Sequence, residues 1–542
     1  MLKIKLIKFS QESGAIPKIS FLGKLLISIL AFGFLCIKPI KVNGSPVSPI
    51  PVSLSLKATI EDALKNNISI AVQKYNSKIT KQSIFEKEAD FDAVFDFNFS
   101  VGEETRQAAG AFADPAKSRN QNYDWDLSLG QKFITGGDYE LNFSNNRNLT
   151  NSVFAGLNPM YTSDLKFTLN QPLLKSFGID NNKREIHIAK NNQKISDFEF
   201  KKSVIDIITE AENTYWDLVF SIEDLKVKKK SLERAQDLEK QVKTQVKVGI
   251  MAPLEVLQAR SEVASRDQLL LSAQDIIMDN EDSLKNILYY SFDSERGQNR
   301  LHPSDAPVFD PGTEGTLEET LQVALNDRPD LLVKKKELEN RNIEAKYNKN
   351  QTFPTLDLVG SLGLNGIAGE AINITSGTVQ GQSQFGGGYG TALNEQLSGN
   401  YRLWEFGLNF SYPLGNRAAK SKLVAKKLEI AQLLLDIKDL EKTIALEVRE
   451  AYRQIKTNIK RVHATRLTRK LAEEKLKAEE KKFEVGLSTS FNVLEFQEDL
   501  AEEQSNEIKA IIDYKKSKNR LRQVKAQTLK ENNIQFSEGV EK

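Results

Sequence analysis

The chain has 542 residues, enough for two or three ordinary domains or for one very elongated domain. Its 75 basic residues nearly balance its 73 acidic residues, so no strong overall field points to nucleic acid as a partner. Three His, one Cys and four Met leave almost nothing from which a metal cluster could be built. Because no serine or cysteine stands in a nucleophile motif either, we expect no enzyme, no metal and no cofactor.

Residues 1–44 are predicted to be a signal peptide. Lysines precede an apolar stretch at residues 25–37, which is too short to span a membrane comfortably but suits the apolar region of an export signal. We place the cleavage after Gly44. The bulky residues before Cys36 fit a lipoprotein acylation site poorly, so we expect no lipid anchor. No later apolar run reaches 18 residues, and we expect no helix that spans a membrane.

The exported part begins with a short amphipathic helix at residues 55–70, capped by Ser55. After it, Phe95, Phe97 and Phe99 alternate with polar residues, and two later segments alternate in the same way. We predict strands at about residues 95–101, 123–145 and 163–171. Such strands can place one side in lipid and the other in a water-filled lumen; an ordinary half-exposed antiparallel sheet is the alternative.

The segment 123–145 reads as an additional hairpin with a turn at residues 135–137, because it has no counterpart later in the chain. It leaves open whether one copy contributes four strands or six, or whether the hairpin projects from the sheet. Trp125 in this segment and Trp404 in a later strand suit either an interfacial aromatic girdle or a buried core position.

Two long helices follow, at about residues 182–247 and 253–290. Apolar residues step by three and four along the first, as at Ile208, Ala211 and Tyr215, in a stripe as narrow as a coiled-coil seam. Neither Pro nor Gly interrupts this helix, so it can reach about 100 Å at 1.5 Å per residue. That length matches the depth of a bacterial periplasm in order of magnitude and exceeds the width of an ordinary domain.

The second half follows the same order of elements. Its predicted elements are a helix at residues 316–331, strands at about 355–364 and 401–413, and long helices at about 417–484 and 490–527. Leu434 and Ile437 belong to the predicted seam of the first long helix. The Gly-, Ser-, Asn- and Gln-rich stretch at residues 365–400 is predicted to be an extracellular loop.

Four blocks of sequence occur twice and in the same order. The paired segments are 55–70 with 316–331, 94–99 with 354–359, 165–173 with 406–414, and 247–260 with 484–497. Chance similarity would not preserve the order, so we predict an internal tandem repeat, with a first half over residues 45–305 and a second over residues 306–542. An open sheet cannot sit in lipid and one chain supplies too few strands to close a pore, so several copies must assemble.

The sequence resembles the TolC-type outer membrane efflux proteins from residue 55 to about residue 524. The resemblance is carried by the duplicated helices SLKATIEDAL and TLEETLQVAL, by NQPLLKSFG and SYPLGNR at the junctions of strand and helix, and by two Val-Gly turns. It implies a mixed, mainly α fold in which a long coiled-coil α-helical barrel continues into an antiparallel β-barrel in outer-membrane lipid. It also implies a homotrimer that extends from the outer membrane into the periplasm.

The resemblance further implies a function. The chain would be the passive exit duct of a tripartite efflux or type I secretion system, opened by a periplasmic adaptor and an inner-membrane pump. The cargo stays open among drugs, metal ions and secreted proteins. The alternative is a structural coiled-coil protein of the cell envelope without a channel.

Gly249 and Gly486 supply the backbone freedom for a tight reversal between paired long helices. By resemblance, both turns lie at the periplasmic tip and contact the adaptor. The residues of these adaptor-docking tips are Val248, Gly249, Ile250, Val485, Gly486 and Leu487. The alternative is that these residues only reverse the chain.

Just inside the tips, the resemblance implies a periplasmic gate narrowed by rings of carboxylates. The matching positions are Glu255, Gln258, Asn492 and Glu495, and the repeat pairs Gln258 with Glu495. Three acids around a narrow opening would repel one another and attract cations. Asn492 departs from the acidic pattern, so we expect less charge there. The alternative for Glu255 and Glu495 is an acid that complements a helix dipole.

Overall fold

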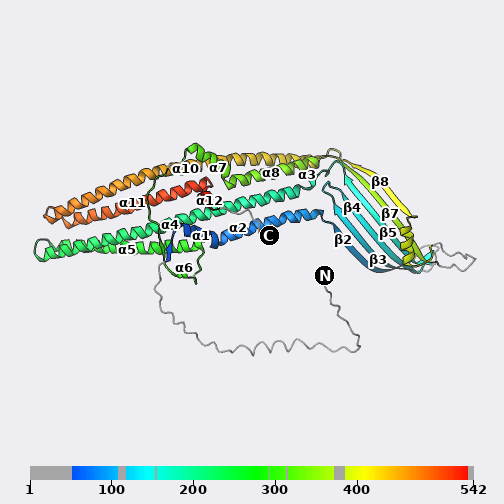
Figure 1. The fold of residues 1–542 in the computed structure, drawn as a ribbon, viewed down its shortest axis with the longest axis horizontal. Helices are drawn as coiled ribbons and strands as arrows, with labels where there is room; N and C mark the ends of the chain where they lie inside the picture. Colours follow the sequence, from blue (N-terminus) through cyan, green and yellow to red (C-terminus); the bar gives the residue numbers. More distant parts are fainter. Residues whose placement is uncertain are drawn as a thin grey trace, which may run out of the picture. The chain divides into compact units, whose positions relative to one another are not determined.

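The computed structural model describes residues 52–107, 117–152, 155–291, 293–312, 315–371 and 385–534. The predicted signal peptide lies outside the described residues, and the described residues belong to one compact unit. Long helices and one large antiparallel sheet make up this unit (Figure 1), so the prediction of a mixed, mainly α fold is confirmed. None of the described helices is both long enough and apolar enough to cross a membrane.

Six strands form the large sheet, and each is antiparallel to its neighbours. In spatial order they are β2 (Val94–Gln107), β3 (Lys117–Lys132), β4 (Asp138–Thr150), β5 (Leu157–Pro172), β7 (Thr355–Ala371) and β8 (Arg402–Ser411). The segment 123–145 lies in β3 and β4, which pair inside the sheet. The described part of one chain therefore contributes six strands to this sheet and no projecting hairpin at this place.

Strand β2 continues to Gln107, beyond the residue 101 that the sequence predicted. The apolar alternation stops at Val101, but polar side chains keep pairing across the strands. Arg119 of β3 donates a hydrogen bond to Glu103 at 2.7 Å, and Gln121 donates to the same carboxylate at 2.7 Å. These cross-strand pairs extend the sheet without an apolar signal in the sequence.

The prediction of a loop over residues 365–400 is wrong at both of its ends. Strand β7 continues to Ala371, and a helix, α9 (Tyr389–Ser398), packs on β7 and β5. Gly366 permits this contact, because a Cβ there would lie 1.9 Å from the carbonyl oxygen of Ala392. The middle of the segment, residues 372–384, lies outside the described residues.

The two faces of the sheet differ in character, as strand alternation requires. Phe97, Leu127 and Phe143 lie opposite one another on the apolar face. Asn98, Asp126 and Ser144 lie opposite one another on the polar face. The apolar face is largely uncovered along the two edge strands β2 and β8.

The two tryptophans on strands have different surroundings. Trp125 is partly buried, with its ring 5.3 Å from that of Phe143 and 5.6 Å from that of Tyr389. Trp404 on β8 is exposed. Trp125 therefore lies in a small core beneath α9, whereas the side chain of Trp404 packs into no core.

Two long helical hairpins dominate the rest of the unit. They are α4 (Arg184–Lys247) with α5 (Pro253–Leu288), and α10 (Arg417–Glu484) with α11 (Ser490–Val524). Shorter helices are α1 (Leu56–Asn66), α2 (Ile68–Glu88), α7 (Leu317–Asp327) and α8 (Pro329–Asn350). The smallest elements are η1 (Ala89–Phe91), α3 (Ile179–Asn182), α6 (Glu295–Gln298), α12 (Thr528–Glu531) and the parallel strands β1 (Val52–Leu54) and β6 (Leu301–Pro303).

Most of the seam predicted from the sequence is buried. Ile208 and Tyr215 of α4 are fully buried, and Ile437 of α10 is buried as well. The prediction for Leu434 is wrong, because this side chain is exposed and the adjacent Leu433 takes the core position. Successive helical side chains differ in direction by about 100°, so one residue decides which of them faces the core.

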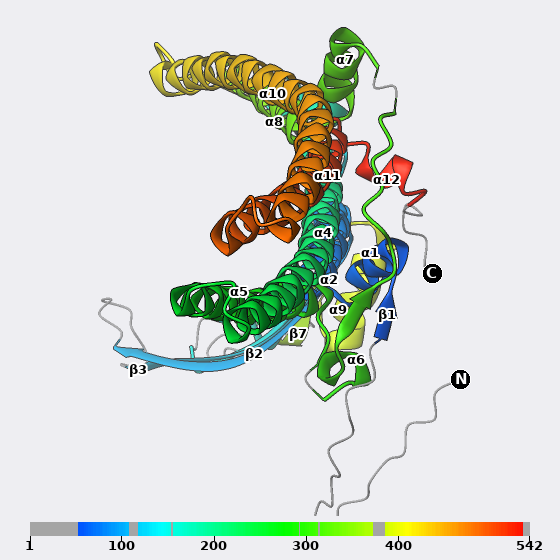
Figure 2. The same cartoon turned by 90° about the vertical axis from the view of Figure 1, so that its left-hand side faces the viewer.

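Near the sheet, four helices lie side by side in the order α2, α4, α8 and α10, since each packs on the next. Viewed along the long helices, α10, α11, α4 and α5 form an open arc (Figure 2). The two end helices of the row near the sheet keep apolar side chains in solvent. These are Val72, Tyr75 and Ile79 on α2, and Val424, Leu428 and Leu435 on α10.

Candidate functional site

The two glycine turns share one backbone geometry. Gly249 and Gly486 adopt φ angles of +79° and +76°, which favour glycine. Each turn closes with the pair of hydrogen bonds of a Schellman motif. In the first turn, the amide of Gly249 donates to the carbonyl oxygen of Val246 at 3.0 Å, and the amide of Ile250 donates to that of Gln245 at 2.9 Å. In the second turn, the amide of Gly486 donates to the carbonyl oxygen of Phe483 at 3.0 Å, and the amide of Leu487 donates to that of Lys482 at 2.8 Å. The turns therefore end α4 and α10 and reverse the chain in the same manner.

Each turn presents two apolar side chains to solvent. Val248 and Ile250 flank the first glycine, and Val485 and Leu487 flank the second. Ile250 is 74% exposed and Leu487 is 79% exposed. Neighbouring exposed apolar groups are typical of an interaction site, and here they stand at the ends of two hairpins.

Glu255 connects the two hairpins directly behind the turns. It stands in the first turn of α5, after Pro253, where its charge also complements the helix dipole. Ser490, the first residue of α11, is fully buried and donates a hydrogen bond to the Glu255 carboxylate. The first predicted gate residue therefore ties one helix start to the other.

Asn492 belongs to a second polar cluster at the start of α11. Its side chain donates to Ser488 at 3.3 Å, and Ser488 donates to the buried carboxylate of Glu479 at 2.5 Å. Lys482 lies 3.0 Å from the other carboxylate oxygen of Glu479. The Ser488 hydrogen bond and then Lys482 lower the pKa of Glu479 below its ordinary value. The cluster therefore keeps the Glu479 carboxylate ionised and hydrogen-bonded to Ser488 in the turn after α10.

Gln258 and Glu495 are both exposed. Within the described residues, neither of them forms a hydrogen bond or an ion pair with another predicted gate residue. The structure thus joins Glu255 directly to Ser490. It joins Asn492 to Glu479 by way of Ser488. The other two predicted gate residues face solvent. No group of three or more His, Cys, Asp or Glu in the described ranges could hold a metal ion.

A further residue, Arg266 of α5, links the hairpins deeper in the structure. Only 3% of it is exposed. Its guanidinium donates to the Leu494 carbonyl oxygen on α11 at 2.7 Å, to the Gln497 side chain at 3.2 Å and to the Ser231 carbonyl oxygen on α4 at 3.2 Å. Glu262, one turn earlier on α5, lies 2.8 Å away and balances the charge.

The sequence contains a signal for Arg266 that was missed. Ala259, Arg266 and Ala273 are seven residues apart, and all three are buried. A cation at a heptad seam position must find partners there, since an unpaired buried charge is costly. The contact of Glu479 with the turn and the hydrogen bond from Ser490 to Glu255 were missed as well, and no comparable local pattern marks these contacts.

The profile of the family described as "outer membrane efflux protein" matches residues 138–288 and 320–526, more than half of the chain. A comparison with curated proteins gave no match.

Solved structures of low sequence identity share the fold. The outer-membrane channel OprN is 14% identical, with a TM-score of 0.62, over 87% of this chain and 90% of its own. The CmeC outer membrane channel of Campylobacter jejuni is 15% identical, with a TM-score of 0.62, over 89% and 90%. The open state of the MtrE outer membrane channel of Neisseria gonorrhoeae is 13% identical, with a TM-score of 0.58, over 88% and 89%. From the family match, the chain belongs to the outer membrane efflux protein family.

Proposed function

We propose that this chain is the exit duct of a tripartite efflux or type I secretion system, a passive conduit across the periplasm and the outer membrane. The observation that carries the proposal is the pair of open edges in one chain. Strands β2 and β8 are the first and last of six strands, and no described strand pairs with their outer edges. In lipid an open edge would leave backbone groups without partners, so the sheet needs other copies to close it.

The helices support the same closure. The open row that begins at α2 and ends at α10 exposes apolar stripes at both ends. Because α2 leads into β2 and β8 leads into α10, one side of the chain carries one edge strand with one end helix. A ring forms when this side of each copy packs on the other side of the next. Three copies would supply about 18 strands, a number that encloses an aqueous channel.

The sheet faces favour a duct over the alternative of a structural coiled-coil protein. A fibre has no need of a sheet with aromatic residues on one face and Asp, Asn and Ser on the other. In a closed barrel the aromatic face contacts lipid and the polar face lines water. The match is to a family of channels, and the chain carries no catalytic motif in its sequence.

We place the two glycine turns at the periplasmic tip, where they would receive the adaptor. The support is the exposed apolar pair at each turn and the common geometry of the two turns. An adaptor that offers a matching apolar surface would bury both pairs at once. The inner-membrane pump supplies the work, and the cargo stays open among drugs, metal ions and secreted proteins.

The gate is proposed to lie just behind these turns. Glu255, Gln258, Asn492 and Glu495 would line it, with the exposed Gln258 and Glu495 nearest the water-filled space. Opening would require the two hairpins to move apart. Two contacts oppose that motion: the hydrogen bond from Ser490 to Glu255, and the bonds from Arg266 to Leu494 and Gln497.

We also propose that the chain arose by internal duplication, with one half before and one half after about residue 305. The support is the paired order of elements. Helices α1 and α7 have 11 residues each, and α4 and α10 have 64 and 68. The hairpin of β3 and β4 is then an insertion in the first half that has no counterpart in the second.

Cysteine cross-linking across the proposed subunit contact tests the duct. Asn98→Cys on β2 is combined in turn with Cys at Glu405, Gly407 or Asn409 on β8, which share the polar face. We expect a disulfide ladder ending at a trimer in the outer-membrane fraction, and no ladder from any of the four single variants. A monomer in the soluble periplasmic fraction, with no cross-link from any pair, would refute the duct and favour the structural protein.

A further inference from the structure

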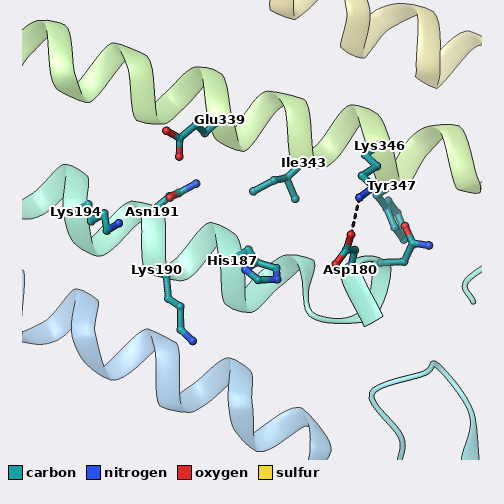
Figure 3. A pocket seen from close by; sticks show the side chains of 10 residues that line it. Asp180, His187, Lys190, Asn191, Lys194, Glu339, Ile343, Lys346 and Tyr347 are labelled. Carbon is teal, nitrogen blue, oxygen red and sulfur yellow. Dashed lines mark hydrogen bonds and ion pairs between the residues drawn. The ribbon is translucent and has the colours of Figure 1, made fainter. Parts of the chain in front are cut away.

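Charged side chains between neighbouring helices of this chain largely find partners inside the chain. A cavity of about 450 Å³ between α4 and α8 is an example, because Lys346 of α8 is bonded there to Asp180 of α3 at 2.6 Å (Figure 3). Lys190 of α4, on the wall of the same cavity, lies 3.6 Å from Glu88 of α2. The outer faces of α5 and α10 differ from this pattern.

Helices α5 and α10 lie at the two ends of the arc that the long hairpins form (Figure 2). Each packs on its hairpin partner with one side and exposes a stripe of residues on another side. Both exposed stripes advance by alternating steps of three and four residues, from Leu254 to Asp282 on α5 and from Arg453 to Lys481 on α10. A stripe with this spacing is typical of a coiled-coil seam, and here it lacks its partner helix within the described residues.

The two stripes are complementary in size when the helices run antiparallel. In one register, three successive layers with a large residue each pair a leucine with an alanine. The pairs are Leu257 with Ala478, Ala264 with Leu471, and Leu271 with Ala464. Large residues opposite small ones allow two helices to pack closely.

The same register pairs the charges of the two stripes. Asp275 of α5 falls opposite Lys460 of α10, and Asp282 falls opposite Arg453. All four side chains are exposed, and none of them forms an ion pair or a hydrogen bond within the described ranges. Opposite charges at facing seam positions favour this pairing of the helices.

Other registers are less favourable. A shift of one heptad in either direction would place an aspartate opposite a leucine: Asp275 opposite Leu467, or Asp282 opposite Leu446. In the favoured register no like charges meet, because the remaining charges of the α10 stripe, at residues 474 and 481, face Ser and Leu. The polar positions therefore select one register, at some cost in stability.

The heights of the paired residues along the helices agree as well. Asp275 lies 22 residues after the start of α5, and Lys460 lies 24 residues before the end of α10. These separations correspond to about 33 and 36 Å from the ends with the glycine turns. The two ends are level because Ser490 is hydrogen-bonded to Glu255. Copies related by rotation about the long axis stand at equal height, so the two residues can meet without a sliding of one copy.

We propose that α5 of one copy and α10 of the next form this antiparallel coiled coil, which closes the ring of helices at the end away from the sheet. The inference rests on the proposed duct, in which copies of this chain are neighbours. It continues the proposed contact near the sheet, because α10 is one helix from Arg417 to Glu484. The exposed charge pairs fix the register and contribute little affinity, since water and salt screen them. The tips can then part between copies as well as between the hairpins of one chain.

Disulfide formation between copies tests the seam. The chain's only cysteine, Cys36, lies in the predicted signal peptide, so the exported chain offers no competing thiol. Leu271→Cys is combined with Ala464→Cys, which lies in the same layer, or with Leu471→Cys, which lies one heptad or about 10 Å further along α10. We expect a ladder ending at a trimer from the first pair and none from the second.

Charge reversal in the first cysteine pair tests the register. Asp275→Lys should slow disulfide formation about fivefold, because it places two cations opposite each other. Asp275→Lys/Lys460→Glu should restore the rate, which a merely structural role of either residue would not do. Asp237→Lys is the matched control, since Asp237 is 70% exposed on α4, inside the arc. This control should keep the original rate.

Three results would overturn the seam. They are no ladder from the first cysteine pair, equal ladders from both pairs, and a charge swap that leaves disulfide formation slow. The sheet pairs that combine Asn98→Cys with a cysteine on β8 show whether each variant still assembles. A ladder from the sheet without one from the helices refutes only the seam, and the absence of both refutes the duct.

Discussion

Replacing Arg266 with Met should loosen the contact between the two helical hairpins. Arg266 lies 13 residues after the start of α5, about 20 Å along the helix from the glycine turn. Its guanidinium reaches α4 through Ser231 and α11 through Leu494 and Gln497. Met has a similar length and keeps the packing of the apolar stem, so the substitution removes mainly the hydrogen bonds and the charge.

The size of the effect follows from these bonds. A hydrogen bond to a charged group contributes about 1.5–3 kcal/mol, and Arg266 makes two such bonds to α11. Part of this is offset, because a buried guanidinium also loses its hydration and Met does not. We therefore expect the closed arrangement to lose about 2 kcal/mol, which is about a 30-fold shift toward the parted hairpins.

Planar-bilayer recordings measure this shift as the fraction of time spent in the high-conductance state. Arg260→Met is the matched control: it lies on the same helix, its side chain is 73% exposed and its nearest carboxylate is 3.9 Å away. Surface pairs of this kind contribute little, so the control should behave as the parent does. If Arg266→Met opened no more often than Arg260→Met, the role of Arg266 as a link between the hairpins would be wrong.

Three further predictions concern the turns and the gate. Gly486→Ala should cost about 1 kcal/mol of local stability, because Ala disfavours a φ of +76°. The added Cβ meets no atom within 4 Å, so the cost comes from the backbone alone. Amide exchange in residues 485–490 should be faster in this variant than in the parent, and it should stay unchanged in the control variant Gly102→Ala. The lowered pKa of Glu479 means that its carboxylate stabilises the turn above the ordinary value of 4.5 and that this stability is lost as the pH falls through the folded value. Amide exchange at the turn should therefore rise more steeply on acidification in the parent than in Glu479→Gln, and equal pH profiles would contradict the argument. Glu495→Ala should raise conductance or weaken block by trivalent cations, and unchanged block would remove Glu495 from the gate.

The long helices could be predicted closely because their determinants are local. Apolar residues spaced by three and four, without Pro or Gly between them, predict one continuous helix, and glycine at the end of each stripe predicts the chain reversal. The aromatic alternation at Phe95, Phe97 and Phe99 likewise predicts the start of a strand. In each case the residues that decide the structure are neighbours in the sequence.

Features that depend on contacts between distant residues could not be predicted. Strand β2 extends past Val101 because its backbone keeps pairing with β3, and there Arg119 and Gln121 also donate hydrogen bonds to Glu103. Helix α9 forms where a Gly-rich composition suggested a loop, because Gly366 lets it approach β7. Composition alone cannot distinguish a glycine that loosens a loop from one that makes room for a helix.

The same limit applies to the gate. Four positions could be carried over by resemblance, but the partners of Glu255 and Asn492 are set by how α11 begins beside α5 and α10. Ser490 and Glu479 therefore emerge only from the structure. The heptad spacing of Arg266 with Ala259 and Ala273 was the one local pattern in the sequence that pointed to a contact between the hairpins.

Single-particle imaging of the purified protein in detergent tests the central claim most directly, because the claim is that sister copies enclose a water-filled bore. The account predicts closed rings in end views, with threefold symmetry and a central opening that runs along the long helices. Particles of a single chain, or rings whose centre is filled along their whole length, would contradict it.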